Sequence, residues 1–374
     1  MLVIKEVKTK KEQKEFLNFP LNLYKDNPYF VPPLYMDEKK IFKKDYLYLD
    51  QAEAVYYNAY MEDVMVGRIS GIIQHASNKK ENQKRVRFTR FDAINDQNVA
   101  NCLFETVEAW AASKGMDTIV GPLGFSDLER EGLLIEGFDQ LSTFEEQYNY
   151  DYYQTLIENY GFTKEVDWVE RKLYLPEHID PRLEKISSMM MKKYNLKFGE
   201  AKNVNDFIKK YADKFFDIID TTYAPLYGTV PLTKATRKMM ISNFKLIVDL
   251  KLVAVIVDEQ DNVVCFGICF PSLSKALQPS NGHLTPLALI RVLKAIKKPQ
   301  ILDLGLIGVL PEYERRGIAS AILNRLMQML QMEGIKYAET NLNLETNDSI
   351  QNQWKSFDSV IHKRRRAFVK PINK

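Results

Sequence analysis

The sequence predicts an α/β protein built from two modules of similar plan. Three observations support this fold class. The 374 residues exceed what one hydrophobic core usually supports. Strand-like and helix-like runs alternate along both halves, and the segments that open and close the first half have counterparts in the second. We therefore expect a duplicated chain of α/β (α+β) class.

The similarity between the halves is visible at both of their ends. Residues 2–8 and residues 196–202 share an apolar alternation that is followed by Glu-x-Lys. Residues 171–176 and residues 366–371 each form a short strand-like run that ends in proline. A repeated beginning and a repeated end indicate that each half is one module.

A polar segment bounded by two prolines separates the halves. Residues 176–181 read Pro-Glu-His-Ile-Asp-Pro, which suits a linker or an exposed connection. We place the boundary near Ile179, so the modules comprise residues 1–178 and 179–374.

In the first half, one helix is especially well supported. Val99, Leu103 and Val107 lie on one helical face, and Gly115 is a stop signal. The expected elements are, in order, a strand at 2–7, a helical region, strands at 54–62, 64–74 and 85–91, a helix at 97–114 and a strand at 118–120.

A buried strand followed by an amphipathic helix dominates the second half. Residues 301–309 form a mostly apolar run without a helical period, which indicates a buried strand. A helix begins at Gly317, because apolar residues recur at helical spacing after it. These residues are Ile318, Ile322, Leu326, Met329 and Leu330.

Three further elements are expected in the second half. They are a strand at 336–344, a short helix opened by Asn347, and a helix at 287–296 that forms a lid or covers a sheet edge.

The loop between that strand and helix predicts a phosphate site. Residues 311–319 read Pro-Glu-Tyr-Glu-Arg-Arg-Gly-Ile-Ala. The first N–H groups of a helix have no intrahelical partner and lie at the positive end of its dipole, so they favour a bound phosphate. Gly317 permits close approach, and Arg315 and Arg316 add positive charge.

This strand, loop and helix resemble the signature of the GNAT superfamily of acyl-CoA-dependent N-acyltransferases. That signature is Val-x-Pro at a strand end, then Gln/Arg-x-x-Gly-x-Gly/Ala at a helix start. Val309, Pro311, Gly317 and Ala319 match it, whereas Glu314 replaces the usual Gln or Arg. The chain is also similar to uncharacterised bacterial proteins with two tandem GNAT-like modules. The resemblance implies a mixed, mostly antiparallel sheet flanked by helices in each module.

The resemblance further implies an acyl-CoA site in the second module only. In the family the strand splays from its neighbour and pairs with the pantetheine arm, and the loop holds the pyrophosphate. The residues so assigned to acetyl-CoA or another acyl-CoA are Ile307, Gly308, Val309, Glu314, Arg315, Arg316, Gly317, Ile318, Ala319, Ser320 and Asn347. The corresponding first-module loop, residues 92–97, has two carboxylates and neither glycine nor arginine, so we expect no CoA there.

Amine acylation needs a group that takes the proton of the acceptor amine. The candidates for this base are Asp303, Glu345 and Glu339. In the family a tyrosine protonates the departing thiolate, but this chain has Trp354 there, and an indole cannot be that acid. Tyr227, together with Tyr223, falls where the superfamily builds its acceptor pocket and is a candidate replacement.

We therefore expect an enzyme that moves an acyl group from acyl-CoA to an amine-bearing acceptor, in the first instance an N-acetyltransferase. Two alternatives remain open. Glu314 and Trp354 favour a catalytically inactive CoA-binding or interaction protein. Paired modules can enclose a larger groove, which favours a long-chain N-acyltransferase.

Composition argues against several other classes. The net charge of +3 is too small to imply nucleic-acid binding, and we interpret the basic residues 363–366 as a solvated strand edge. The four histidines are widely spaced, so no metal site is expected. Cys265 and Cys269 are typical of core thiols. Since no apolar run could span a bilayer and no signal peptide opens the chain, we expect a cytoplasmic protein without a transmembrane segment.

Overall fold

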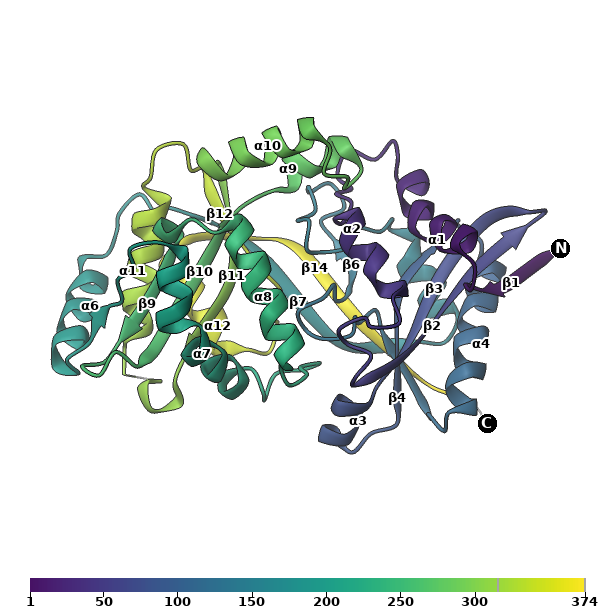
Figure 1. Cartoon of the computed structure of the whole chain (residues 1–374), viewed down its shortest axis with the longest axis horizontal. Helices are drawn as coiled ribbons and strands as arrows, with labels where there is room; N and C mark the ends of the chain where they lie inside the picture. The colour runs from purple at the N-terminus through teal and green to yellow at the C-terminus, as the bar shows by residue number, and fades with distance from the viewer. Residues whose placement is uncertain (315, 373–374) are drawn as a thin grey trace. The chain divides into compact units, whose positions relative to one another are not determined.

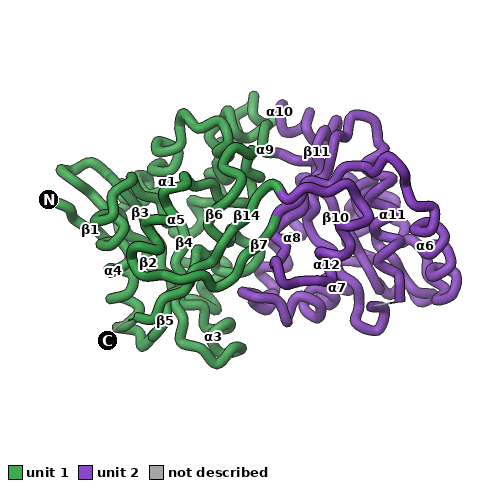
Figure 2. Tube along the Cα trace, turned by 180° about the vertical axis from the view of Figure 1, so that it is seen from behind, with its two compact units in different colours: residues 1–169, 274–290, 362–374 green, residues 170–273, 291–361 purple. Residues whose placement is uncertain are grey.

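The computed structural model describes residues 1–314 and 316–372, which form two compact units (Figures 1 and 2). Unit 1 contains residues 1–169, 274–290 and 362–372, and unit 2 contains residues 170–273 and 291–361. Each compact unit thus includes segments from both halves of the sequence. The division into modules 1–178 and 179–374 stays a prediction. It follows the order of the sequence, whereas the two units are defined by the contacts between residues.

Unit 1 is a sheet of mostly antiparallel strands with helices packed against it (Figure 1). Its strands are β1 (Leu2–Glu6), β2 (Ala52–Met61), β3 (Val64–Gln74), β4 (Arg85–Ala93), β5 (Thr118–Gly121), β6 (Leu133–Glu136) and most of β14 (Asp358–Pro371). Its helices are α1 (Lys10–Leu23), α2 (Tyr35–Glu38), α3 (His75–Glu81), α4 (Gln97–Ser113), α5 (Tyr152–Asn159) and α9 (Ser274–Leu277), with 3₁₀ turns η1 (Lys39–Phe42) and η3 (Gln278–Ser280).

Unit 2 has the same kind of construction. Its strands are the end of β7 (Thr163–Tyr174), β8 (Lys197–Phe198), β9 (Val253–Val257), β10 (Val263–Pro271), β11 (Ile301–Val309), β12 (Tyr337–Thr340) and β13 (Asn343–Leu344). Its helices are α6 (Pro181–Lys193), α7 (Val204–Thr222), α8 (Lys234–Ile247), the end of α10 (Pro286–Lys297), α11 (Ala319–Leu330) and α12 (Asp348–Gln353). Its 3₁₀ turns are η2 (Leu250–Leu252), η4 (Pro311–Tyr313) and η5 (Trp354–Ser356).

The strands of the two units share one order and one pattern of strand directions within the sheet. In unit 1 the order is β1-β2-β3-β4-β5-β14, with β4 and β5 parallel and the other neighbours antiparallel. In unit 2 the order is β8-β9-β10-β11-β12-β7, again with one parallel pair, β11 and β12. The predicted fold class, α/β with mixed and mostly antiparallel strand pairing flanked by helices, is confirmed.

In each unit a helix follows the fourth strand of the sheet order and packs against the sheet. This helix is α4 after β4 in unit 1 and α11 after β11 in unit 2. In unit 1, Val99, Leu103 and Val107 of α4 are fully buried, as their spacing predicts. In unit 2, alternate residues of β10 serve opposite faces: Phe266 packs with residues of α7, and Cys265 packs with residues of α11. Burial on both faces explains why this strand is a continuous apolar run.

Two local predictions need correction. The basic residues near the carboxyl terminus are not a solvated strand edge, because β14 runs through the core of unit 1. Lys363 is 1% exposed and Arg365 is 0% exposed. Arg366 forms a bidentate ion pair with Asp167, at 2.7 Å and 2.9 Å. In addition, the strand expected at 336–344 is divided into β12 and β13.

The insertion between β10 and β11 is fixed to unit 1 at its start. The Gln278 side-chain amide donates to the carbonyl oxygens of Pro28 and Phe30, at 2.8 Å and 2.9 Å. The Tyr35 N–H donates to Gly282 O at 3.0 Å, and the rings of Tyr35 and His283 are stacked 4.2 Å apart. Among the described residues, no helix is long and apolar enough to cross a membrane.

Candidate functional site

Strands β11 and β12 of unit 2 separate partway along their length. Their parallel pairing covers four positions and ends where Leu304 faces Thr340. On its other side β11 continues to pair with β10 as far as Val309. A bulge opposite Ile268 and Cys269 leaves Gly305 as the extra residue of β11. Half of β11 therefore has one edge that β12 does not cover.

The backbone alternation of β11 determines which groups reach this open edge. The Leu310 N–H donates to Val264 O at 2.9 Å, so the antiparallel ladder directs the backbone of Gly308 toward β10 and that of Ile307 and Val309 away from it. Gly308 instead fulfils a packing requirement. A Cβ atom there would lie only 2.7 Å from the Phe266 ring.

A tyrosine side chain occupies the open edge at Ile307. The Tyr223 hydroxyl donates to Ile307 O at 3.0 Å, and the Ile307 N–H donates back to the same hydroxyl at 3.3 Å. Tyr223 lies at the carboxyl end of α7 and is partly buried. One phenol thus satisfies the two backbone groups that a further strand, or an extended amide-bearing ligand, would pair with.

The loop after β11 leads into a helix whose first turn has no side-chain cap among the described residues. Gly317 has φ of +75°, a left-handed conformation that suits glycine. Helix α11 begins at Ala319, and no side chain caps it from Ile318. The Ser320 hydroxyl donates to Gly317 O, so it turns back along the chain. The predicted residue Arg315 lies outside the described residues.

The neighbouring charged residues of this loop are at the surface. Arg316 is exposed, and its guanidinium lies over the rings of Tyr194 and Tyr313, at 5.3 Å and 5.8 Å from their centroids. Two aromatic faces hold the cation in place without consuming its hydrogen-bond donors. Glu314, the departure from the family pattern, is also exposed.

The equivalent helix of unit 1 is capped. The Asp96 carboxylate accepts from the N–H groups of Asn98 and Val99, at 2.8 Å and 3.3 Å. A carboxylate therefore already occupies the anion-favouring end of α4. The two equivalent helix starts therefore differ in one respect that matters for phosphate binding. A carboxylate occupies the N–H groups of α4, whereas no side chain caps α11 at Ile318.

The corresponding strand edge of unit 1 is occupied by tyrosine hydroxyls, as the β11 edge is by Tyr223. The Ala93 N–H donates to the Tyr153 hydroxyl at 2.9 Å, and Ala93 O accepts from Tyr152 at 2.8 Å.

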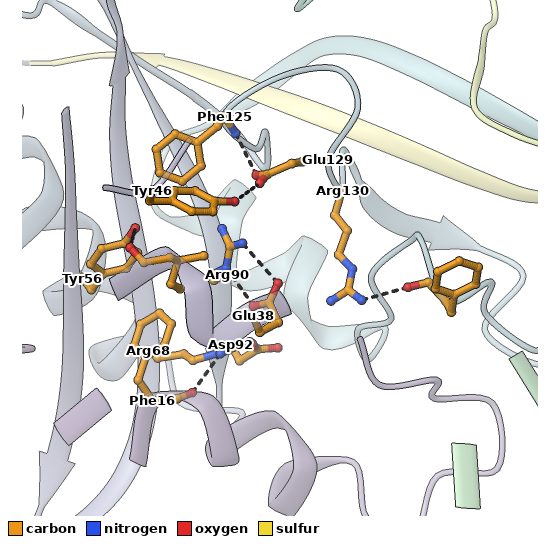
Figure 3. A network of polar contacts seen from close by, with 12 residues as sticks. Phe16, Glu38, Tyr46, Tyr56, Arg68, Arg90, Asp92, Phe125, Glu129 and Arg130 are labelled. Carbon is orange, nitrogen blue, oxygen red and sulfur yellow. Dashed lines mark hydrogen bonds and ion pairs between the residues drawn. The ribbon is translucent and has the colours of Figure 1, made fainter. Parts of the chain in front are cut away.

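Unit 1 also contains a charged network beside β4, which Figure 3 shows. In this network Arg90 binds both oxygens of Glu38, at 3.0 Å and 3.2 Å. Burial opposes ionisation of Glu38, but the charges of Arg90, Arg130 and Arg68 and the hydrogen bond from Arg90 together outweigh it and lower the pKa to about 2.

Two carboxylates lie at paired positions just before β11 and β12 separate. Asp303 faces Glu339 across the parallel pair, and these residues are 8% and 7% exposed. Burial raises the pKa of the nearby Tyr337 hydroxyl, and the charges of Glu339 and Asp303 add to this shift. The Lys172 ammonium lies 5.2 Å from the centroid of the Tyr337 ring. The predicted base Asp303 is therefore part of a cluster of titratable groups.

The other predicted residues have different environments. Glu345 follows β13 and Tyr227 follows α7, and both are partly buried. Asn347 caps α12, since its side-chain oxygen accepts from the Ile350 N–H at 3.2 Å. Trp354 is 4% exposed and donates its indole N–H to Asn343 at 2.8 Å, so it belongs to the core.

Sequence reasoning did not assign a role to Lys172 or Tyr337. Both belong to the titratable cluster, but strand pairing brings Lys172 from a distant part of the chain. The period-2 alternation of residues 337–340 was a usable signal, since it places Tyr337 and Glu339 on one face. The sequence contained no comparable signal for the partner strand.

Comparisons with solved structures identify the fold. A tandem GNAT protein from the clavulanic acid biosynthesis pathway matches with a TM-score of 0.56 and 9% identity, covering 100% of this chain and 99% of that one. A GCN5-related N-acetyltransferase from Sphaerobacter thermophilus matches with a TM-score of 0.50 and 11% identity, covering 100% and 96%. The chain therefore has a tandem GNAT fold, and the predicted resemblance is confirmed at that level.

Two curated relatives match over nearly the full length. Protein YghO from Escherichia coli is 26% identical and covers 97% of this chain and 94% of its own. The bacterial ceramide synthase of Caulobacter vibrioides is 24% identical and covers 98% and 96%. No family model matches the chain.

Proposed function

We propose that the chain is an acyl-CoA-dependent N-acyltransferase with its CoA site in unit 2. The observation that carries the proposal is the combination of an open β11 edge with an uncapped α11 start. The edge at Ile307 and Val309 suits the amides of a pantetheine arm. The N–H groups behind Gly317, with Arg316 beside them, suit a pyrophosphate.

The contrast with unit 1 supports this assignment. There the same helix end is occupied by Asp96, whereas α11 has no side-chain cap at Ile318. A pyrophosphate at α4 would meet a carboxylate at short range. We infer that unit 1 does not bind CoA and that the duplicated units have diverged in function.

The proposed reaction forms a C–N bond and breaks a C–S bond. The acceptor amine, once deprotonated, attacks the thioester carbonyl, and the CoA thiolate leaves and takes up a proton. We assign the removal of the amine proton to Asp303, with Glu339 as its neighbour. Tyr223 is our candidate proton donor to the thiolate, because its hydroxyl already lies at the β11 edge. Tyr227 remains a secondary candidate for the proton donor, and Glu345 remains a secondary candidate for the base.

A long acyl chain and an amphiphilic amine are the favoured substrates. The specific observation is full-length similarity to a protein named bacterial ceramide synthase. A ceramide is an amide of a long-chain amino alcohol, so that name denotes acyl transfer to nitrogen. We propose the same reaction class here, with acetyl transfer as the second candidate.

Calorimetric titration with acetyl-CoA and with a long-chain acyl-CoA tests the cofactor site. We expect binding that Arg316→Glu weakens by at least about tenfold, because the change reverses the charge at the phosphate position. The matched control is Asn98→Glu, which introduces a carboxylate at the α4 start and should leave CoA binding unchanged. No binding of either thioester, or equal effects of the two variants, would refute the site.

Thiol release then separates an enzyme from a binding protein. The purified protein is mixed with acyl-CoA and a panel of amines, including long-chain amino alcohols, amino acids and polyamines. Release that depends on one class of amine identifies the acceptor. Tight CoA binding without release from any amine would support the inactive binding protein instead.

A further inference from the structure

Helix α10, labelled in Figure 1, carries several large aliphatic side chains that are exposed. Ala288 is fully buried, and Val292, Ala295 and Ile296 are partly buried, so this side of the helix contacts the protein. Leu287, Leu289, Ile290 and Leu293 are 61%, 45%, 63% and 56% exposed. An ordinary surface helix has the opposite arrangement, with aliphatic residues inward. A contiguous apolar surface of this kind marks an interaction site.

The chain around α10 carries only positive charge. From residue 262 to residue 302 the sequence contains no aspartate or glutamate. Its charged residues are Lys275, Arg291, Lys294, Lys297 and Lys298. Four of these five cations lie within or directly after α10, next to the aliphatic residues. The surface thus combines apolar side chains with lysines, whose stems can extend so that the ammonium groups reach a polar layer.

This combination argues against a second copy of the chain as the partner. In a two-fold dimer each surface meets its own copy, which would bring Lys294 and Lys297 toward the same lysines. Like charges at a closed interface are unfavourable. The partner should instead offer apolar surface beneath a layer of negative charge. An anionic lipid bilayer has this structure.

We propose that α10 lies in the interfacial layer of an anionic membrane, with Leu287, Ile290 and Leu293 below the headgroups and the lysines among them. The helix has 12 residues. It is therefore about 18 Å long, too short to span a bilayer and long enough to lie along its surface. The proposal concerns binding alone and does not depend on acyl transfer.

Vesicle co-sedimentation with the full chain tests this surface. We expect binding to vesicles of phosphatidylcholine mixed with phosphatidylglycerol, and much weaker binding to phosphatidylcholine alone or at high salt. The triple variant Leu287→Gln, Ile290→Gln, Leu293→Gln should lower the partition coefficient by at least about tenfold. Lys294→Gln and Lys297→Gln should each lower it by about fivefold.

Matched controls come from helix α8 of unit 2. Leu246 is 73% exposed there, and Lys238 is also exposed. Leu246→Gln and Lys238→Gln make the same chemical changes outside the proposed surface and should bind vesicles like the wild type. All these side chains are exposed, so the variants should fold normally, which thermal unfolding checks.

The fluorescence of a tryptophan placed on α10 gives a second, independent measurement of membrane binding. Tryptophan at position 290, in Ile290→Trp, should shift its emission to shorter wavelength when anionic vesicles are added, and Leu246→Trp should not. Equal sedimentation of the triple variant and the wild type would overturn the proposal. So would loss of a dimer in the triple variant with unchanged vesicle binding, since α10 would then be a contact between copies.

Discussion

The Tyr223 hydroxyl both donates to Ile307 O, at 3.0 Å, and accepts from the Ile307 N–H, at 3.3 Å. These are the backbone groups at the open edge of β11, just beyond the point where β12 leaves it. A ligand that pairs with this edge must replace the phenol. After replacement the same hydroxyl would remain close to the ligand, where it could donate its proton.

This relationship predicts opposite effects of Tyr223→Phe on binding and on turnover. Removing the hydroxyl frees the edge, so the affinity for CoA should rise by about tenfold, corresponding to the net value of the two lost hydrogen bonds. The rate constant kcat should fall if the phenol protonates the thiolate. Calorimetry gives the first quantity and thiol release gives the second.

Tyr227→Phe tests the secondary candidate, because it removes a hydroxyl four residues further along the chain. It should change neither quantity if Tyr223 alone is the acid. Weaker CoA binding by Tyr223→Phe would contradict the idea that this phenol competes with the ligand.

The paired carboxylates give a second prediction. Asp303→Asn should lower kcat by about 10²–10⁴-fold, the usual contribution of a general base, with little effect on CoA affinity. It should also remove the acidic limb of the pH–rate profile. Glu339→Gln should have a smaller effect if Glu339 only neighbours the base, and exposed Glu333→Gln should have none. An unchanged pH–rate profile in Asp303→Asn would assign that carboxylate a structural role.

Local sequence patterns predicted most elements of this fold. The expected strand at 64–74 coincides with β3, and the helix expected at 97–114 corresponds to α4. The spacing of apolar residues predicts both the type of element and its buried face, so contacts with distant parts of the chain were not needed for these predictions. The same holds for α11, whose predicted apolar face is buried.

Long-range pairing was the part that the sequence could not supply. The basic residues 363–366 have the composition of an exposed edge, yet β14 enters the core of unit 1, where Asp167 neutralises Arg366. In the candidate site, the loop was recognisable from its glycine and helix start. The position of Tyr223 was not, because the side-chain direction at the end of α7 depends on how that helix packs.

Glu38 predicts a pH dependence of the stability of unit 1. Its pKa is lowered from 4.5 to about 2 because the effect of burial is outweighed by the combined charges of Arg90, Arg130 and Arg68 and the hydrogen bond from Arg90. A lowered carboxyl pKa stabilises the fold fully above pH 4.5, and this contribution is lost as the pH falls from 4.5 toward 2. Glu38→Gln should therefore lower the free energy of unfolding by about 3 kcal/mol at neutral pH.

The difference between this variant and the wild type should shrink below pH 4.5, as urea unfolding at several pH values would measure. Asp37→Asn is the control on the same helix, because the Asp37 side chain is 45% exposed and its ion pair with Lys40 is at the surface. A difference that stays constant through acid pH would contradict the role of the Glu38 charge.

Asn347 predicts a separation of stability from cofactor binding. Its side chain caps α12 by accepting from the Ile350 N–H, and Asn347→Ala should therefore lower the free energy of unfolding by about 1 kcal/mol. Asn347→Asp keeps an acceptor at the cap and should restore stability. The carboxylate would repel a bound CoA phosphate, so Asn347→Asp should weaken CoA binding only if residue 347 contacts the cofactor. Urea unfolding and calorimetry on the two variants therefore distinguish a helix cap from a cofactor ligand: equal CoA affinities in wild type, Asn347→Ala and Asn347→Asp would remove Asn347 from the proposed site.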